Sequence, residues 1–243
     1  MIIIPARLAS SRLPNKVLAP IGKYPMVIQT AMRVKEVDEV VIATDSNEVI
    51  ETAKKYNIKA LLTSSKHKSG TDRVYEAASK LNLKAHDIIL NIQADEPFIE
   101  QEVIKSLLEL TKKYQNNKEV IATTCYKEVS ATTAQDPNIV KVVTNKENFA
   151  LYFSRSPIPF HRENQQISYK AHLGLYGFTF EKLQLFCNMP TSQLEDIEKL
   201  EQLRILDNNY KIALVKVQSN SFGIDTKEDL QKAKELIDKI LKV

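Results

Sequence analysis

The chain has 243 residues, of which 43% are hydrophobic and 26% charged, as in an ordinary globular protein. Its net charge of +4 comes from 34 Lys and Arg against 30 Asp and Glu, with no run of five like charges, which argues against a nucleic-acid-binding protein. The apolar run at 1–4 is too short for a signal peptide, and no later run approaches about 20 residues. Cys125 and Cys187 lack metal-binding or redox spacing, so we expect buried thiols in a cytoplasmic protein.

Strands and helices alternate over the first half of the sequence. Apolar runs predict strands at 1–4, 38–44, 58–63 and 86–94. Helical patterns lie between and after them, at 47–56, 69–81 and 101–114, with Asp45 and Ser46 as a capping signal for the first. This order is typical of a mostly parallel sheet with right-handed crossover connections.

The pattern changes after residue 118. Four strand-like runs follow without a helix between them, at 119–128, 139–145, 149–160 and 172–180. A helix at 192–209, a strand at 211–218 and a helix at 227–243 complete the chain, and Asp225, Thr226 and Asp229 mark the start of the last helix with a capping box. We predict a single three-layer α/β domain over 1–243, with a mixed-sheet excursion at about 145–180.

The apolar residues of this excursion are too many for one small core. They are Phe149, Leu151, Tyr152, Phe153, Ile158 and Phe160. We therefore expect part of the excursion to pack against a second copy of the chain with two-fold symmetry.

The segment after the first strand is rich in cations. Arg7, Arg12 and Lys16 occur within ten residues, with Ser10 and Ser11 among them. The chain has only five glycines and neither a G-x-G-x-x-G nor a P-loop motif, which disfavours those two nucleotide-binding folds. A loop with long cationic side chains suits a nucleoside triphosphate, because guanidinium groups bind pairs of phosphate oxygens. A solvated basic loop is the alternative.

Two acidic residues follow predicted strands, at the edge where open parallel sheets bind ligands. Asp95 comes after the strand at 86–94, and Asp225 comes between the last strand and the last helix. One or two carboxylates plus phosphate oxygens are the ligands that Mg²⁺ prefers. Either aspartate could instead cap a helix, and for Asp225 the two roles are compatible.

Seven motifs in this order resemble those of the CMP-Kdo synthetases, the 3-deoxy-manno-octulosonate (Kdo) cytidylyltransferases. They are IIIPARLASSRLPNKVL, SGTDR, NIQADEP, VKVV with ALYFSRSPIP, HLGLYGF, LEDIEKLEQLR and GIDTKEDL. The resemblance covers nearly the whole chain and implies a Rossmann-like nucleotidyltransferase fold, a homodimer and Mg²⁺. The implied reaction converts CTP and Kdo to CMP-Kdo and pyrophosphate for lipopolysaccharide assembly. One departure is Ala94, where the family pattern has glycine.

The resemblance also implies a role for individual residues. Lys16, Asp95 and Asp225 would be catalytic, with the two aspartates as metal ligands. The CTP-binding set would be Arg7, Ser10, Arg12, Lys16, Ser69, Gly70, Thr71 and Arg73. The sugar-binding set would be Gln93, Arg155, His172, Tyr176, Glu201 and Gln202, with Arg155 holding the sugar carboxylate through a bidentate contact.

Other interpretations stay open at this point. The pattern alone would read His172 as a packed strand histidine and Glu201 as one of several acids on a charged helix, while His67, His86 and His161 show no functional pattern. A cytidylyltransferase for 8-amino-Kdo or a sialic acid shares the same activation chemistry. A sugar-1-phosphate nucleotidyltransferase would be expected to have a glycine-rich opening loop. A catalytically inactive nucleotide-binding protein is disfavoured by the intact aspartates and cations.

Overall fold

The computed structural model describes residues 1–9, 13–163 and 167–241. The chain divides into two compact units. Unit 1 contains Met1–Leu83, Asn91–Ile104 and Ser219–Val243, and unit 2 contains Lys84–Leu90 and Lys105–Gln218. The prediction of one domain over 1–243 stays a prediction. In the part of the chain that is described, no helix is long and apolar enough to cross a membrane.

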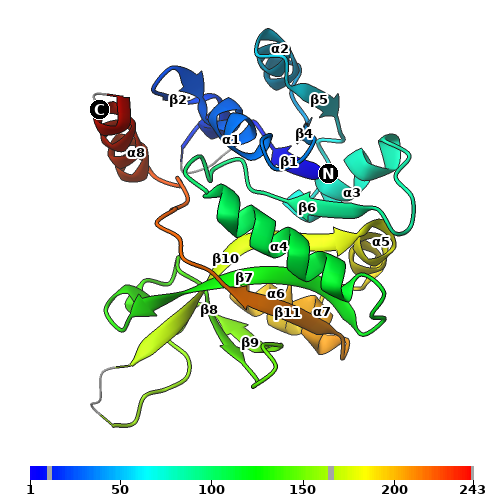
Figure 1. The fold of residues 1–243 in the computed structure, drawn as a ribbon, viewed down its shortest axis with the longest axis vertical. Coiled ribbons are helices and arrows are strands. Elements are labelled where there is room, and N and C mark those ends of the chain that lie inside the picture. Colours follow the sequence, from blue (N-terminus) through cyan, green and yellow to red (C-terminus); the bar gives the residue numbers. More distant parts are fainter. Residues whose placement is uncertain (10–12, 164–166, 242–243) are drawn as a thin grey trace. The chain divides into compact units, whose positions relative to one another are not determined.

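Unit 1 is built on parallel strands (Figure 1). β1 (Ile2–Ala6) pairs with β4 (Val40–Thr44), and β4 pairs with β5 (Lys59–Leu62). Every residue of β1 and β4 is buried, as expected of near-continuous apolar strands covered on both faces. Helices pack on these strands: α1 (Met26–Val34), α2 (Asn47–Lys55) and α3 (Gly70–Lys80). The predicted parallel βα arrangement is confirmed here.

Four elements of unit 1 are absent from the sequence-based assignment. A 3₁₀ helix, η1 (Lys16–Leu18), precedes a short hairpin of β2 (Pro20–Ile21) and β3 (Tyr24–Pro25). Helix α1 follows directly, and its buried residues include Met26, Ile28 and Ala31. Its first apolar residues are consecutive, so the periodicity of the run does not stand out from that of a short buried strand.

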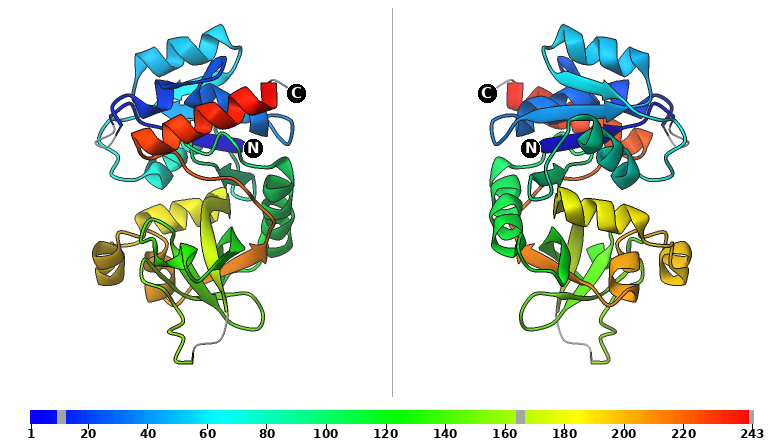
Figure 2. Two further views of the ribbon diagram at one scale, coloured as in Figure 1. Left: turned by 90° about the vertical axis from the view of Figure 1, so that its left-hand side faces the viewer. Right: turned by 90° about the vertical axis from the view of Figure 1, so that its right-hand side faces the viewer.

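Unit 2 contains a mixed sheet. β7 (Val120–Ser130) pairs antiparallel with β10 (Ser168–Thr179) and parallel with β11 (Lys211–Lys216). β8 (Lys141–Thr144) pairs antiparallel with β9 (Ala150–Ser154) and with β10. Helix α5 (Phe180–Asn188), which was not predicted, packs on β7 and β10, as both views of Figure 2 show. β6 (Ile88–Asn91) and α4 (Gln101–Tyr114) have residues in both units.

The single helix predicted at 192–209 is wrong. The structure has two short helices there, α6 (Gln193–Glu198) and α7 (Leu203–Asp207). Lys199 adopts a left-handed conformation with φ 54°, which ends α6. The guanidinium of Arg155 donates to the carbonyl oxygens of Glu198 and Lys199, at 2.8 and 3.4 Å, and so stabilises the break. Glu201 and Gln202 therefore lie at the junction of two helices.

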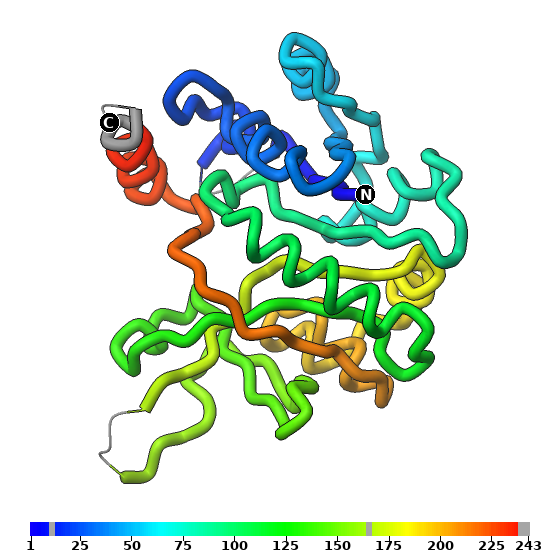
Figure 3. Tube along the Cα trace, viewed as in Figure 1, coloured from blue at the N-terminus to red at the C-terminus, as the bar shows by residue number. Residues whose placement is uncertain are grey.

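The last helix, α8 (Lys227–Leu241), follows an irregular segment at 217–226 (orange in Figure 3). The predicted capping box is present. Asp229 N–H donates to Thr226 Oγ1 at 3.1 Å, and Thr226 N–H donates to Asp229 Oδ2 at 3.0 Å. These contacts satisfy backbone donors at the helix start without using the side chain of Asp225. The carboxylate of Asp225 contacts Lys16 instead.

Candidate active site

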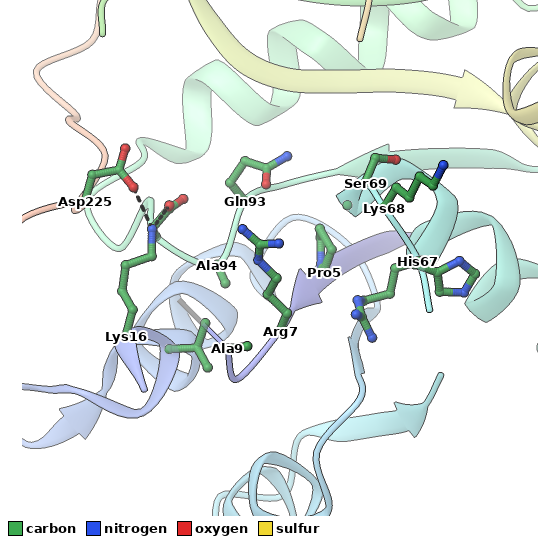
Figure 4. A pocket seen from close by; sticks show the side chains of 14 residues that line it. Pro5, Arg7, Ala9, Lys16, His67, Lys68, Ser69, Gln93, Ala94 and Asp225 are labelled. Atoms are coloured by element: carbon green, nitrogen blue, oxygen red, sulfur yellow. Dashed lines mark hydrogen bonds and ion pairs between the residues drawn. The ribbon is translucent and has the colours of Figure 1, made fainter. Parts of the chain in front are cut away.

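A pocket of about 320 Å³ in unit 1 brings many of the predicted residues together. Those that line it are Arg7, Lys16, Ser69, Gly70, Arg73, Gln93, Asp95 and Asp225. They come from the segment after β1 up to the start of η1, from the first turn of α3 and the residue before it, and from the segments after β6 and before α8, which are distant in sequence. Figure 4 shows Lys16 and Asp225 at one end of the pocket and Ser69 and His67 at the other.

Lys16 joins the two predicted metal ligands. Its Nζ lies 2.5 Å from Asp95 Oδ2 and 2.8 Å from Asp225 Oδ1 (dashed lines in Figure 4). The Lys16 side chain is 13% exposed, whereas those of Asp95 and Asp225 are 26% and 41% exposed, so the ammonium is shielded from solvent more than the carboxylates are. Burial alone would lower the pKa of the Lys16 ammonium, but the charges and hydrogen bonds of the two carboxylates outweigh it and raise that pKa above 10.5. Lys16 is therefore a cation at physiological pH.

The two aspartates also suit a divalent cation. Both approach a single positively charged group, so their oxygens converge on one point. Within the described residues, no group of three His, Cys, Asp or Glu side chains could hold a metal. Mg²⁺ is commonly bound by one or two carboxylates, water and substrate phosphates. The donor set fits Mg²⁺ whose coordination is completed by a substrate.

Several contacts hold Asp225 near Asp95. The N–H of Ile224 donates to the carbonyl oxygen of Asp95 at 3.0 Å. The Ser221 hydroxyl donates to Glu96 at 2.5 Å, and the ring of Phe222 stacks on that of Phe98 with centroids 5.4 Å apart. These contacts hold the residues after β6 against the segment before α8. The carboxylates of Asp95 and Asp225 therefore lie close together.

Ala94, which departs from the family pattern, lies within this arrangement. It is buried and lines the pocket. Its carbonyl oxygen accepts a hydrogen bond from Thr30 Oγ1 of α1 at 2.9 Å. The turn therefore accommodates a methyl group in place of the glycine hydrogen.

Arg73 lines the pocket, but its guanidinium is hydrogen-bonded within the protein. The residue is 3% exposed, and its guanidinium donates to Thr63 Oγ1 at 2.7 Å and to Asp45 Oδ2 at 2.9 Å. The other oxygen of Asp45 accepts from the N–H of Leu8 at 3.2 Å. Asp45 thus links Arg73 to the loop after β1. Ser46, the N-cap residue of α2, forms no side-chain hydrogen bond that caps the helix. Ser10 and Arg12 lie outside the described residues.

The N-terminus of α3 forms another wall of the pocket. Ser69 caps it by accepting a hydrogen bond from Asp72 N–H at 3.1 Å. A Cβ on Gly70 would lie 3.3 Å from Pro5 Cγ, which is a tight contact, so glycine suits this position. Thr71 is buried and accepts a hydrogen bond from Asn91 at 3.3 Å, and so lies behind the pocket surface.

Two polar pocket residues were missed by the sequence analysis. His67 and Lys68 precede α3 and line the pocket. His67 Nε2 contacts Glu76, whose carboxylate also accepts from Ser64 N–H at 2.8 Å and pairs with Lys80 at 2.7 Å. Burial alone would raise the pKa of Glu76, but these partners lower it to about 2. No local motif signals the pair, because His67 and Glu76 meet only once the loop folds back on α3.

The predicted sugar-binding residues are divided between the units. Gln93 lies in unit 1 and lines the pocket, while Arg155, His172, Tyr176, Glu201 and Gln202 belong to unit 2. Within unit 2, the rings of His172 and Tyr176 lie 5.4 Å apart, and the charge of Glu201 acts on Tyr176. Three predicted residues are thereby brought together, and Gln202 adjoins Glu201 in sequence.

His172 is neutral in the folded protein. Its ring packs against Phe153 with centroids 4.9 Å apart, and its Nε2 lies 2.9 Å from Thr124 Oγ1. The Thr124 hydroxyl has one hydrogen, which it donates to a carbonyl, nearest that of Leu175 at 2.6 Å. Nε2 must then carry the proton in this contact. Burial lowers the pKa of His172 to about 3.

Tyr176 and Gln202 present buried polar groups. Burial, together with the charge of Glu201, raises the pKa of Tyr176 well above 10.0, so its phenol keeps its proton. Gln202 is 3% exposed, and its Nε2 has no hydrogen-bond partner among the residues described. A buried amide donor without a partner is costly, and a bound ligand that accepts its hydrogen bond removes that cost.

Arg155 is held by backbone oxygens. Besides the carbonyls of Glu198 and Lys199, its guanidinium donates to the carbonyl of Pro137 at 3.1 Å. The Glu198 carboxylate in turn accepts from Ser154 Oγ at 2.6 Å and from Arg155 N–H at 2.9 Å. This geometry gives Arg155 a role in positioning residues 198–199. Its predicted contact with the sugar carboxylate stays a prediction.

The sequence is similar to those of known cytidylyltransferases. The sequence matches the family described as Cytidylyltransferase over residues 1–212. It is 57% identical over 232 residues to a 3-deoxy-manno-octulosonate cytidylyltransferase of a Nitratiruptor species, covering 96% of this chain and 97% of that relative. A protein of the same name from Wolinella succinogenes is 51% identical over 237 residues, covering 96% and 97%.

Solved structures extend the similarity to the fold. The structure of CMP:2-keto-3-deoxy-manno-octonic acid synthetase complexed with CTP has a TM-score of 0.89 and 37% identity, covering 98% of both chains. A cytidylyltransferase from Leptospira borgpetersenii has a TM-score of 0.65 at 20% identity, covering 98% of this chain and 86% of the other, and is similar in fold alone. The predicted Rossmann-like nucleotidyltransferase fold is confirmed.

The neutral state of His172 predicts a dependence of stability on pH. The pKa is about 3 in the folded protein and 6.5 ordinarily, so between these values the unfolded chain binds a proton that the folded one does not. The contribution of His172 to the free energy of unfolding is therefore fully present above pH 6.5. Below that pH the free energy of unfolding falls by about 1.4 kcal/mol per pH unit because of this residue. Urea unfolding between pH 5.5 and 4.5 gives the slope of the free energy of unfolding against pH. For His172→Gln this slope should be shallower than that of the wild type by this amount.

The matched control is His86→Gln, because His86 is 74% exposed. That variant should keep the slope of the wild type. Equal slopes for His172→Gln and the wild type would show that His172 takes up its proton without unfolding.

Proposed function

The chain belongs to the cytidylyltransferase family, and from this premise we propose that it transfers the cytidylyl group of CTP to the anomeric hydroxyl of Kdo. The products are CMP-Kdo, an activated sugar for lipopolysaccharide assembly, and pyrophosphate. The observation that carries the proposal is the pocket in which Lys16, Asp95 and Asp225 meet beside the start of α3. The named relatives act on 3-deoxy-manno-octulosonate, which favours Kdo over its 8-amino derivative.

The reaction is an in-line displacement at phosphorus. A bond forms between the anomeric oxygen and the α-phosphorus, and the bond from that phosphorus to the bridging oxygen of pyrophosphate breaks. The anomeric hydroxyl loses its proton, and negative charge grows on the leaving pyrophosphate. Transfer of this kind depends on positioning and on charge neutralisation more than on a covalent intermediate.

The residues of unit 1 suit the nucleotide. Arg7 and Lys16 supply positive charge for the triphosphate, which spreads over many oxygens and suits several cationic side chains. Ser69 and Gly70 place backbone N–H groups of a helix start at the pocket wall. We assign Asp95 and Asp225 to Mg²⁺, which when bound supplies positive charge beside phosphate oxygens and makes a bound hydroxyl more acidic.

The residues of unit 2 suit a polyhydroxylated sugar acid. The protonated phenol of Tyr176 and the buried amide of Gln202 supply donors, and Glu201 supplies an acceptor. His172 is neutral, so it can bind a hydroxyl but does not neutralise the carboxylate. Positive charge for the carboxylate is assigned to Arg155.

We place the enzyme in the cytoplasm, where CTP is made. Neither Cys125 nor Cys187 forms a disulfide, and Cys187 is only half-buried, unlike Cys125. Burial raises the pKa of the Cys125 thiol to about 12, so that thiol is unreactive. Cysteines outside disulfides fit a reducing compartment.

The direct test of the function is release of pyrophosphate from CTP in the presence of Mg²⁺ and Kdo. Parallel reactions with 8-amino-Kdo, and with UTP in place of CTP, identify the sugar acid and the base. We expect Kdo with CTP to give the highest kcat/KM. Release that does not depend on a sugar acid would contradict the proposal.

Neutralising either metal ligand should remove most of the activity. Asp95→Asn and Asp225→Asn keep the size of the side chain but lose the charge that binds Mg²⁺, so kcat/KM should fall at least about 100-fold, or about 2.7 kcal/mol. Glu48→Gln, an exposed change on α2, is the control for net charge and should be silent. If a variant keeps activity within about threefold of the wild type and folds normally, that aspartate is not a ligand.

Loss of Arg155 should affect the two substrates differently. Arg155→Ala removes a charge-assisted contact to the sugar carboxylate, so kcat/KM for Kdo should fall about ten- to a hundredfold while the Kd for CTP stays nearly unchanged. Titrations of both substrates measure this. Equal losses, with a lower free energy of unfolding, would instead assign Arg155 to its contacts with the carbonyls of Glu198 and Lys199.

We also propose a homodimer that uses the predicted excursion. Phe153 is buried in unit 2, whereas Leu151 is 59% and Phe160 86% exposed, so part of the apolar surface lies outside the core. We expect a dimer in sedimentation at micromolar concentration, and dissociation by Phe160→Glu. Leu62→Glu, at another exposed apolar residue in unit 1, should leave the dimer intact. A monomeric wild type would contradict this proposal.

A further inference from the structure

The ammonium group of Lys16 lies where a metal bound to both carboxylates would lie. Its Nζ is 2.5 Å from Asp95 Oδ2 and 2.8 Å from Asp225 Oδ1. Mg²⁺ binds carboxylate oxygens at about 2.0–2.1 Å. A cation in contact with both oxygens would overlap the ammonium, so the two cannot occupy this place together.

The charges of the three groups also oppose simultaneous binding. Two carboxylates and one ammonium sum to one negative charge. Adding a divalent cation without an anion would place three positive charges against two negative ones around an ammonium that is only 13% exposed, where repulsion is stronger than in water. A triphosphate supplies enough negative charge for both the ammonium and the metal.

We propose that Lys16 is an internal counter-ion that blocks the metal site until a nucleotide triphosphate takes over its ammonium group. In the absence of nucleotide, Lys16 neutralises Asp95 and Asp225 and keeps them together. When the triphosphate binds, the ammonium moves to its phosphate oxygens and exposes both carboxylates to the metal. This inference rests on the proposed function and deepens it.

The local structure allows the side chain to move while the backbone stays in place. Lys16 starts η1, and its N–H donates to the carbonyl oxygen of Leu13 at 3.1 Å. Val17, the next residue, is buried and anchors the turn. The four-carbon side chain carries its charge on one compact group that can rotate between acceptors. Only the side chain of Lys16 needs to exchange its hydrogen-bond partners.

A consequence is that metal and nucleotide binding are coupled. In the site without nucleotide, metal binding is weakened by the free energy required to displace Lys16 from the carboxylates. Once the nucleotide binds the ammonium, this displacement is no longer required. By linkage, the metal raises the affinity for nucleotide by the same factor. A metal ion alone should therefore bind poorly to a site that has two suitable ligands.

The experiment measures binding of Mn²⁺ alone, in the absence of nucleotide, from the electron paramagnetic resonance signal of the free ion. Lys16→Met should bind Mn²⁺ at least tenfold more tightly than the wild type, because its carboxylates are vacant. Lys16→Arg keeps the charge and should bind as weakly as the wild type. Lys23→Met, at an exposed lysine, controls for net charge and should also match the wild type.

A double variant tests whether the tighter binding of Mn²⁺ occurs at this site. Adding Asp225→Asn to Lys16→Met should abolish the tighter binding. Far-UV circular dichroism checks the fold, and Lys16→Gln replaces Lys16→Met if the latter unfolds. Equal Mn²⁺ affinity for the wild type and a folded Lys16→Met or Lys16→Gln would overturn the proposal.

Titration of the wild type with CTP, with and without Mg²⁺, separates this inference from the proposed function. CTP binding together with equal Mn²⁺ affinities would reject the counter-ion role alone. A wild type that binds no CTP under either condition would reject the proposed function. Tighter binding of CTP with Mg²⁺ is the expected result.

Discussion

The arrangement of the nucleotide site depends on the contact of Lys16 with Asp95 and Asp225. Two carboxylates placed together repel each other, and the ammonium between them removes that cost. The hydrogen bond from Ile224 N–H to the Asp95 carbonyl, and the stacking of Phe222 on Phe98, bring the backbones into place. The ammonium of Lys16 thus keeps the two proposed metal ligands together.

Under the proposed function, the side chains of each unit suit the charge of one substrate. Unit 1 supplies the cations and acids that a triphosphate and its metal require. Unit 2 supplies mostly neutral hydrogen-bonding groups, of which His172 and Tyr176 are kept uncharged by burial. Neutral donors and acceptors suit the hydroxyls of a sugar, and a single arginine then suffices for its carboxylate.

The sequence predicted strands and helices well where a continuous apolar run stood out, as in β1 and β4, or where a helical period dominated, as in α3 and α4. It failed where tertiary contacts decide the conformation. The helix at 192–209 breaks at Lys199 because Arg155, more than 40 residues away, binds the carbonyls there. The Lys16, Asp95 and Asp225 cluster was predictable from the strand ends. The inward engagement of Arg73 by Asp45 and the contact of His67 with Glu76 arise only on folding.

The most direct measurement is anomalous diffraction from crystals grown with CTP and Mn²⁺. We expect a Mn²⁺ peak in contact with carboxylate oxygens of both Asp95 and Asp225, with Lys16 Nζ bonded to a phosphate oxygen. A peak away from either aspartate, or Lys16 still hydrogen-bonded to both carboxylates beside bound CTP, would contradict this expectation.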